Sequence, residues 1–516
     1  MQIDLQNLPS DRAVLHHLVR DMATVMARRD EEIERLCQVI KQLQRSHFGR
    51  RSERLDPDQL ALALEDLDSD IASTDAPHQT PDIEADLPED TETPGQTALP
   101  GHLPRESVVL DAEHDACPDC GGALHAIGES VSEMLDWVPA RLRVIRIRRP
   151  KYGCRGCGTI HQSGAPDRLI TRGLATPGLI SQVLISKYCD HTPLYRQSQI
   201  FARQGVELSR STLARWVGGA SWWLEPLHER LRQNILASDH LFADDTPLPV
   251  LDPGRGRTKT GRLWAYARDQ RGWGGADPPA ALYCYEPDRR AVRPAAHLAD
   301  YKGVLHVDGY AGFETLAARG DIVLAACWAH TRRKFYEVYQ ATGSPIAAEA
   351  LSRIGDLYTI ERHLRGQAAA VRLSERNKHS GPLIEAMKPW LEGQLRRIPP
   401  KGPLAEAIRY ALNRWMALTR FLDDGHIELD TNPVERAIRP IALGRKNHMF
   451  AGSDKGGQRW AIICSLIETA KLNGVEPYAW LSDTLQRMVD GHPNNRLDEL
   501  LPWNQVNNPS SLKSVQ

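Results

Sequence analysis

Residues Leu241–Leu251, LFADDTPLPVL, place two adjacent acids, Asp244 and Asp245, in an otherwise apolar segment that contains two prolines. The length and apolar character of this segment predict a buried strand. Acidic side chains are rarely buried unless a partner charge or a metal ion compensates them. We therefore expect this strand to carry part of a functional site.

The segments that follow have the composition of further strands, with one helix among them. The expected strands are residues 261–269, 279–287, 303–313 and 321–330, and the helix covers residues 290–301. Three strands, a helix, a strand and then helix–strand alternation is the order of a ribonuclease-H-like α/β layer. In this order Asp308 lies at the end of the fourth strand, beside Gly309.

A third acid comes from a distant segment, Leu429–Asn447, LDTNPVERAIRPIALGRKN. Thr431 or Asn432 can cap a helix here and Pro433 suits its first turn, so Glu435 points from that turn. Three acids on two strands and a helix can hold two divalent ions about 3.5–4 Å apart, which activate water or a 3′-hydroxyl against a phosphodiester. Taken singly, each acid has a structural explanation that is as good as metal binding. A turn would explain Asp308, and a favourable interaction with the helix dipole would explain Glu435.

Two C-x-x-C pairs precede this region, and each is followed by glycine. Four thiolates form a closed tetrahedral zinc site that leaves no position for water or substrate, so the expected zinc is structural. The alternating segment 141–153, RLRVIRIRRPKYG, predicts a strand of a zinc ribbon, and its arginines are candidate phosphate contacts. The expected ligands are Cys117, Cys120, Cys154 and Cys157.

The N-terminal region combines a heptad pattern with an acidic segment. Apolar residues at heptad spacing over residues 11–46 predict a coiled coil that pairs two chains, and an amphipathic helix packed on its own protein is the alternative. The formal net charge of the chain is −2, yet Leu55–Pro104 holds 13 acidic residues and no Lys or Arg. The rest of the chain is therefore strongly basic and can bind a polyanion. The acidic, aperiodic residues 56–104 are predicted to be a disordered linker that competes with the polyanion for this basic surface.

Residues 166–236 have the layout of a helix-turn-helix. Helices are expected over residues 177–189 and 193–204 and from Ser209 onward, with Gly205 at the turn and Ser209 as N-cap. Many helical hairpins of this kind bind no DNA, so that alternative stays open. In the helix-turn-helix interpretation, Ser211, Thr212, Arg215 and Trp216 lie on the second helix, and Arg215 is the candidate DNA contact.

The composition bounds the class of protein. At 516 residues the chain is too long for a single core, so we expect several domains. No segment approaches the roughly 18 apolar residues of a membrane span, and the N-terminus does not have the pattern of a secretory signal. Nine cysteines, four of them in metal-ligand pairs, favour a reducing compartment and predict a cytoplasmic protein without a membrane partner.

Several long motifs resemble those of DDE transposases of the insertion-sequence 66 family. They are ADDTPLPVL, HVDGYAGF, CWAHTRRKF, TNPVERAIRPIALGRKN and AGSDKGGQRWAIICSLIETAKLNGVEPYAWL, together with SHFGRRSERL and the double C-x-x-C module. The resemblance covers the chain from about residue 40 to 485. It implies a ribonuclease-H-like fold, magnesium as cofactor, and strand cleavage and strand transfer at transposon ends.

The resemblance also assigns the acids. The first catalytic Asp falls on Asp244, because the family has ADET where this chain has ADDT, so Asp245 takes the accessory position of the usual Glu. The second falls on Asp308 and the catalytic Glu on Glu435. These three residues are the expected ligands of two magnesium ions.

Basic residues near these acids are candidate DNA contacts, because cleavage requires the DNA backbone to lie against Glu435. His330 with Arg332 and Arg333 can position phosphate, although a histidine satisfied within the core is an equal explanation. The expected partners are double-stranded DNA of the element ends and the target, a second copy of the chain, and small companion proteins. The candidate DNA-binding residues are Arg215, Arg436, Arg439, Arg445 and Lys446.

The expected fold is a multidomain α+β protein, and two other functions remain open. A nuclease would cut DNA without joining it, and a zinc-containing DNA-binding regulator would use the acids structurally. The expected regions are a coiled-coil helix (11–46), an acidic linker (56–104), a zinc module (105–165), a helix-turn-helix region (166–236), the first part of the ribonuclease-H-like core (237–339), a helical insertion (340–424), the catalytic helix (425–450) and a C-terminal helical region (451–510).

Overall fold

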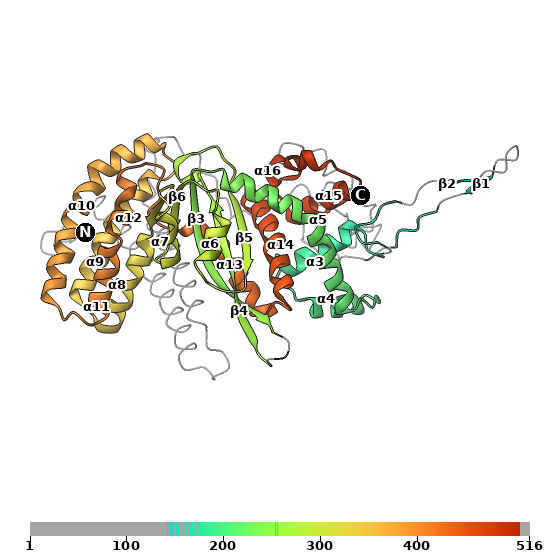
Figure 1. The fold of residues 1–516 in the computed structure, drawn as a ribbon, viewed down its shortest axis with the longest axis horizontal. Helices are drawn as coiled ribbons and strands as arrows, with labels where there is room; N and C mark the ends of the chain where they lie inside the picture. Colours follow the sequence, from blue (N-terminus) through green and yellow to red (C-terminus); the bar gives the residue numbers. More distant parts are fainter. Residues whose placement is uncertain are drawn as a thin grey trace, which may run out of the picture. The chain divides into compact units, whose positions relative to one another are not determined.

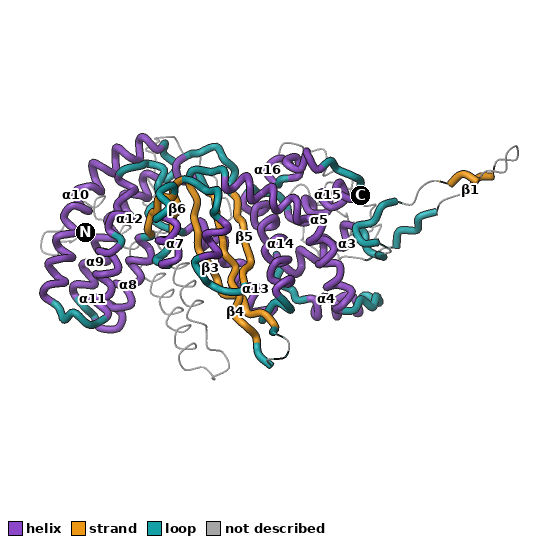
Figure 2. Tube along the Cα trace, viewed as in Figure 1, coloured by secondary structure: helices purple, strands orange, loops and turns teal. Residues whose placement is uncertain are grey.

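The computed structural model describes residues 142, 144–148, 151–153, 160–162, 166–171, 173–252, 254 and 256–505 (Figures 1 and 2). Contacts divide the chain into one unit of Met1–Leu62 with Arg149–Gln516 and another of Ala63–Arg148. The first unit holds all described residues except 142 and 144–148. The predicted coiled coil, the acidic linker and the four zinc-ligand cysteines lie outside the described residues.

A five-stranded mixed sheet forms the centre of the first unit (Figure 1). The strand order is β5-β4-β3-β6-β7, in which β3, β4 and β5 are antiparallel and β3, β6 and β7 are parallel. The prediction for the first strand is confirmed at both ends. The strands are β3 (His240–Leu251), β4 (Thr258–Arg268), β5 (Ala280–Glu286), β6 (Gly303–Val307) and β7 (Ile322–Ala326).

Two of the predicted strands are shorter than expected, because helices begin within them. β6 ends at Val307, and the turn that follows is stabilised by the Tyr310 N–H, which donates to Asp308 Oδ1 at 2.9 Å. β7 ends at Ala326, and Trp328 N–H donates to Leu429 O at 2.9 Å instead of to a neighbouring strand. The predicted connecting helix is also shorter, since α6 covers only Val292–His297. The helices that replace the strand ends are α7 (Ala311–Ala317) and α8 (Trp328–Thr342).

Helix α14 (Asp454–Leu472) covers the outer edge of β5 (Figure 1). Tyr283 N–H donates to Ser465 Oγ at 2.8 Å, and the Thr469 hydroxyl bonds both the N–H (3.2 Å) and the carbonyl (3.1 Å) of Ala281. Backbone groups on an edge strand otherwise need water or a partner strand. The hydroxyls of α14 therefore terminate the sheet on this side.

Replacing Thr469 with Val should destabilise the protein by about 1–3 kcal/mol, because it leaves the buried backbone groups of Ala281 without a partner. The matched control is Thr359→Val, since the exposed Thr359 hydroxyl only donates to Gly355 O within its own helix. Urea denaturation measures both changes. Equal midpoints for the two variants would contradict this account of the edge.

The region predicted as a helical insertion is helical, and it has its own apolar core. This core includes Trp328, Phe335, Ile354, Leu391 and Phe421. Beside it, two guanidinium groups are buried in ion pairs: Arg376 with Glu361 at 2.7 Å and Arg372 with Glu428 at 2.9 Å. The elements after α8 are α9 (Pro345–Leu364), α10 (Ala369–Arg397), α11 (Pro403–Asn413), α12 (Trp415–Thr419) and the 3₁₀ turn η2 (Arg420–Leu422).

The helices of the predicted helix-turn-helix lie within one residue of their expected bounds. Ser209 caps the helix that begins at Arg210, since its Oγ accepts the Thr212 N–H at 3.1 Å. Trp216 of this helix is 4% exposed and packs in the core. Burial of a large aromatic side chain on the inner face of a helix stabilises the fold, because apolar area is removed from water. The helices are α3 (Pro177–Tyr188), α4 (Leu194–Arg203) and α5 (Arg210–Leu236).

Among the described residues of the strand predicted over 141–153, Lys151–Gly153 form β1, which pairs antiparallel with β2 (Ile160–Gln162). Residues 144–148 have no regular secondary structure, and the side chain of Val144 is 95% exposed. That part of the prediction is wrong. Alternation alone does not make a strand, because the backbone also needs a hydrogen-bonded neighbour, and the pairing with β2 starts at Lys151.

The C-terminal residues are helical as expected. α15 (Pro477–Val489) packs against α3 and α5. It is followed by the 3₁₀ turn η3 (Asn494–Leu500) and by α16 (Pro502–Gln505). In the part of the chain that the structure describes, none of the helices is both long and apolar enough to span a bilayer.

Candidate active site

The alternation of β3 sends its two adjacent acids to opposite faces of the sheet. Asp244 is in register with Ala265 on β4, which is in register with Tyr283 on β5, and the Tyr283 hydroxyl donates to Ala437 O of α13 (Asn432–His448). Asp244 therefore shares the face covered by α13. Asp245 lies on the other face and requires a separate explanation.

Asp308 lies next to Asp244 because β3 and β6 are parallel and in register. Ala243 is paired with Val307, so Asp244, which lies within β3, is at the same level as Asp308, the residue that follows the end of β6. The Asp308 carboxylate accepts the Tyr310 N–H and starts the turn into α7. The two acids thus lie at the same level of two neighbouring parallel strands, at the point where β6 ends and β3 continues.

Glu435 reaches the same place because the chain returns to the end of β7 before α13 begins. Thr431 N–H donates to Cys327 Sγ at 3.4 Å, just after that strand. Thr431 is the N-cap residue of α13, one of the two predicted alternatives, but its hydroxyl donates to Glu435 Oε1 at 2.6 Å instead of accepting a backbone N–H. His330 Nδ1 lies 3.6 Å from the same oxygen. Glu435 is therefore held by one hydroxyl beside one imidazole.

The Asp244 carboxyl group is affected by the charges of the other two acids. Burial raises the pKa of Asp244 well above its ordinary value, and the Asp308 and Glu435 carboxylates raise it further, whereas His330 lowers it. Asp244 is thus the acid that most needs a compensating positive charge. All the carboxyl oxygens are hard ligands, which is the donor set that magnesium prefers.

Asp245 is compensated by protein cations. Its side chain is 1% exposed, and it pairs with Arg262 (3.0 Å) and Arg289 (2.7 Å). Burial raises the pKa of Asp245, whereas both guanidinium groups lower it. The Arg289 guanidinium also lies over the ring of Tyr310, 4.5 Å from its centroid. Asp245 thereby ties β3 to β4 and to the segment before α6.

Replacing Asp245 with Asn should cost about 1–3 kcal/mol of stability, because its two arginines lose a charged acceptor. The DNA cleavage that the motif resemblance implies should fall by only about tenfold, as is typical when a residue behind the reacting groups is changed. Denaturation and a cleavage assay measure the two effects. Near-normal cleavage by Asp244→Asn together with an inactive Asp245→Asn would show that the roles are reversed.

Sequence reasoning missed the groups that position the acids. Cys327 was assigned no role, Thr431 was expected only as a helix cap and not as a partner of Glu435, and the arginine pair of Asp245 was not foreseen. Asp430 was also missed, although burial and Glu428 raise its pKa to about 7. The one available signal was the CWAH motif. It pointed to His330 as a candidate but did not indicate that His330 lies beside Glu435.

Family models match most of the chain. Residues 172–459 match the model described as Transposase IS66 family, and residues 465–503 match IS66 C-terminal element. Residues 114–158 match the zinc-finger binding domain of transposase IS66, and residues 35–108 match Transposase C of IS166 homeodomain. The chain belongs to the IS66 transposase family. The resemblance expected from its motifs is therefore confirmed.

Curated relatives match the IS66 family member over nearly its full length. Uncharacterized protein y4jD of Sinorhizobium fredii is 43% identical over 518 residues, which cover 98% of both chains. Uncharacterized protein y4qI of the same organism is 41% identical over 487 residues, covering 92% of this chain and 89% of the relative. The zinc-finger match spans all four predicted zinc ligands and supports a zinc-binding module.

The candidate DNA-binding residues of this family member differ in their surroundings. Arg445 donates to Pro247 O of β3, so it also supports the fold, whereas Lys446 is exposed. Arg436 is exposed beside Asp269 at 3.7 Å, and Arg439 is half-buried on the next turn. Arg215 is exposed on α5. Four of the five thus lie on the helix of Glu435.

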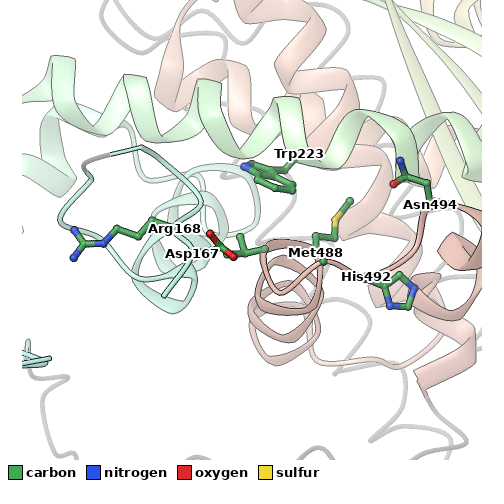
Figure 3. Close-up of a pocket in the computed structure, with 8 residues that line it drawn as sticks. Asp167, Arg168, Trp223, Met488, His492 and Asn494 are labelled. Carbon is green, nitrogen blue, oxygen red and sulfur yellow. The ribbon is translucent and has the colours of Figure 1, made fainter. Parts of the chain in front are cut away.

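A cavity of about 470 Å³ lies away from the acids. Figure 3 shows Trp223 of α5 beside Met488 of α15, with Asp167, Arg168 and His492 also in its wall. Trp223 Nε1 donates to Leu169 O at 2.8 Å, which fixes this side of the cavity. The acids are not among its lining residues, so the candidate chemistry of the IS66 family member does not use it.

Proposed function

We propose that this chain is a DDE transposase that cleaves DNA at insertion-sequence ends and transfers the cut strand to target DNA. The convergence of Asp244, Asp308 and Glu435 carries this proposal. The three residues come from β3, the end of β6 and the first turn of α13, and the carboxylates of Asp308 and Glu435 both raise the pKa of Asp244. Membership of a transposase family supports a DNA-processing role for such a cluster.

We further propose that the core is ribonuclease-H-like. The supporting observation is the order β5-β4-β3-β6-β7, with three antiparallel strands followed by two parallel ones. This arrangement puts the end of β6 beside Ala243 and Asp244 of β3 and leaves one face for α13. The long helical region between Asp308 and Glu435 is then an insertion into that core.

The donor set fits two magnesium ions held by Asp244, Asp308 and Glu435. The fit rests on an acid whose pKa is raised first by burial and then by its acidic neighbours, because the ionised form of such a group is stabilised when divalent cations balance the charge. Bound ions would activate water or a 3′-hydroxyl for in-line attack on a phosphodiester.

The chain's own residues orient the acids and the DNA. The Thr431 hydroxyl fixes Glu435, the Tyr310 N–H fixes Asp308, and the arginine pair of Asp245 holds β3 in place behind Asp244. Lys446 and Arg436 are exposed on the helix that carries Glu435, where they would contact the phosphate backbone. Arg215 would contact DNA from α5.

The other proposed components are a structural zinc, DNA partners and self-association. Cys117, Cys120, Cys154 and Cys157 would bind one zinc ion, and metal analysis of reduced protein tests this by its stoichiometry. The proposed partners are double-stranded terminal repeats and target DNA, a second copy paired through residues 11–46, and small companion proteins. Loss of self-association on removing residues 1–45 is the expected result in sedimentation.

A cleavage assay on labelled terminal repeats with magnesium distinguishes the possible functions. Joined products are expected from a transposase. Nicks without joining would indicate a nuclease, and binding without cleavage would indicate a DNA-binding regulator. Either of the last two results would overturn the proposed strand transfer.

A further inference from the structure

A second group of ligand-type side chains lies at the start of β3. His240, Asp424 and His426 each bring one nitrogen or oxygen atom to within 4.8 Å of the others. His240 is the first residue of β3, and the other two follow η2, where the chain returns from the helical region. We propose that these three residues bind one divalent transition-metal ion, most suitably zinc. This site is separate from the three acids and does not rest on the proposed function.

The donor types distinguish this site from the acidic one. Two imidazole nitrogens and one carboxylate oxygen form a three-ligand set typical of zinc, with a fourth position for water. Magnesium instead prefers oxygen ligands alone. The two sites would therefore select different metals.

The distances between these side chains fit three ligands of one metal ion better than they fit a closed hydrogen-bond network. His426 Nδ1 lies 2.7 Å from Asp424 Oδ1, but His240 Nε2 is 3.8 Å from Asp424 Oδ2, too far for a hydrogen bond. His240 Nδ1 is buried without a hydrogen-bond partner in the described part of the chain. The side chain of His240 is 12% exposed and that of His426 is 46% exposed, so an ion can enter from one side.

Both segments that carry the ligands are held by the fold. His240 is paired with Val304 across β3 and β6. The loop on the other side is anchored by Arg376, whose Nη1 donates to the carbonyls of Phe421 (3.2 Å), Asp424 (3.4 Å) and Gly425 (3.5 Å). A Cβ on Gly425 would lie 1.9 Å from Ala369 O, so the loop packs directly on α10.

The surroundings neither repel a cation strongly nor supply a competing ligand. The charge of Arg376 is balanced by Glu361, and that of Arg372 by Glu428. The nearby His306 uses both ring nitrogens elsewhere, with Leu241 O at 3.2 Å and with the Glu428 N–H at 3.0 Å. A bound ion would link β3 to the end of the helical region and stabilise both.

Zinc titration of the full-length protein tests this site, with the cysteine module already loaded and magnesium in excess. The wild type is expected to take up one further zinc per chain and to show a higher melting temperature. His426→Ala should lose both effects. Asp424→Asn should lose them too, although the asparagine oxygen can still accept the backbone N–H of His426. The control is His379→Ala, which removes an exposed histidine of α10 that pairs with Glu375.

The uptake by these variants decides between the outcomes. Loss in His426→Ala and Asp424→Asn, with normal uptake in His379→Ala, supports the site. Equal uptake by all four proteins, or no further zinc in the wild type, overturns it. Circular dichroism establishes that each variant is folded before titration, and because His426 is half exposed its replacement should leave the fold intact.

Discussion

Asp244→Asn should reduce DNA strand cleavage by about a thousandfold or more, because it removes a proposed ligand whose metal ions contribute several kcal/mol to the transition state. Asp308→Asn and Glu435→Gln should have comparable effects. Each change keeps the size of the side chain and removes one negative charge. Cleavage and joining of labelled terminal repeats measure the loss.

Folding and DNA binding should survive these changes. In metal-free protein, Asp244→Asn should even be stabilising near neutral pH. The folded-state pKa of Asp244 is raised, so its ionisation destabilises the fold as pH rises from the ordinary value toward the raised one. The variant should lose this pH dependence. Wild-type cleavage by Asp244→Asn, or its failure to fold, would contradict the assignment.

Glu361→Gln should lower the free energy of unfolding by about 3–5 kcal/mol, because it leaves a buried guanidinium without its counter-charge. Arg376 is 0% exposed, and its Nε and Nη2 each lie 2.7 Å from a Glu361 oxygen. Arg372, which is 1% exposed, has Glu361 as its more distant partner at 3.5 Å. The denaturation midpoint, followed by tryptophan fluorescence, measures the loss.

The control for this change is Glu349→Gln. Glu349 pairs with Arg353 on the surface of α9 at 2.9 Å, and its side chain is 50% exposed. Solvent screens such a pair, so its loss should cost only about 0–1 kcal/mol. Similar midpoints for both variants would show that the buried pair contributes no more than a surface one.

Local sequence patterns determined many elements of this protein. The bounds of β3, the helices around Ser209 and the helical character of the region after α8 follow from apolar periodicity, caps and breaks. The motifs also identified the family and named Asp244, Asp308 and Glu435. These features depend on residues close together in the chain, where the physical rules act over one or two turns or along one strand.

Only the tertiary structure decided how those residues meet. The register of β3 with β6 brings Asp308 beside Asp244, and the contacts of Cys327 with Thr431 bring Glu435 to them from more than a hundred residues away. The pleat assigns Asp244 to the face of α13 and leaves Asp245 to its two arginines. The grouping of His240 with Asp424 and His426 arises in the same way. Such contacts depend on packing and strand pairing between distant segments, and a single sequence carries no local pattern for them.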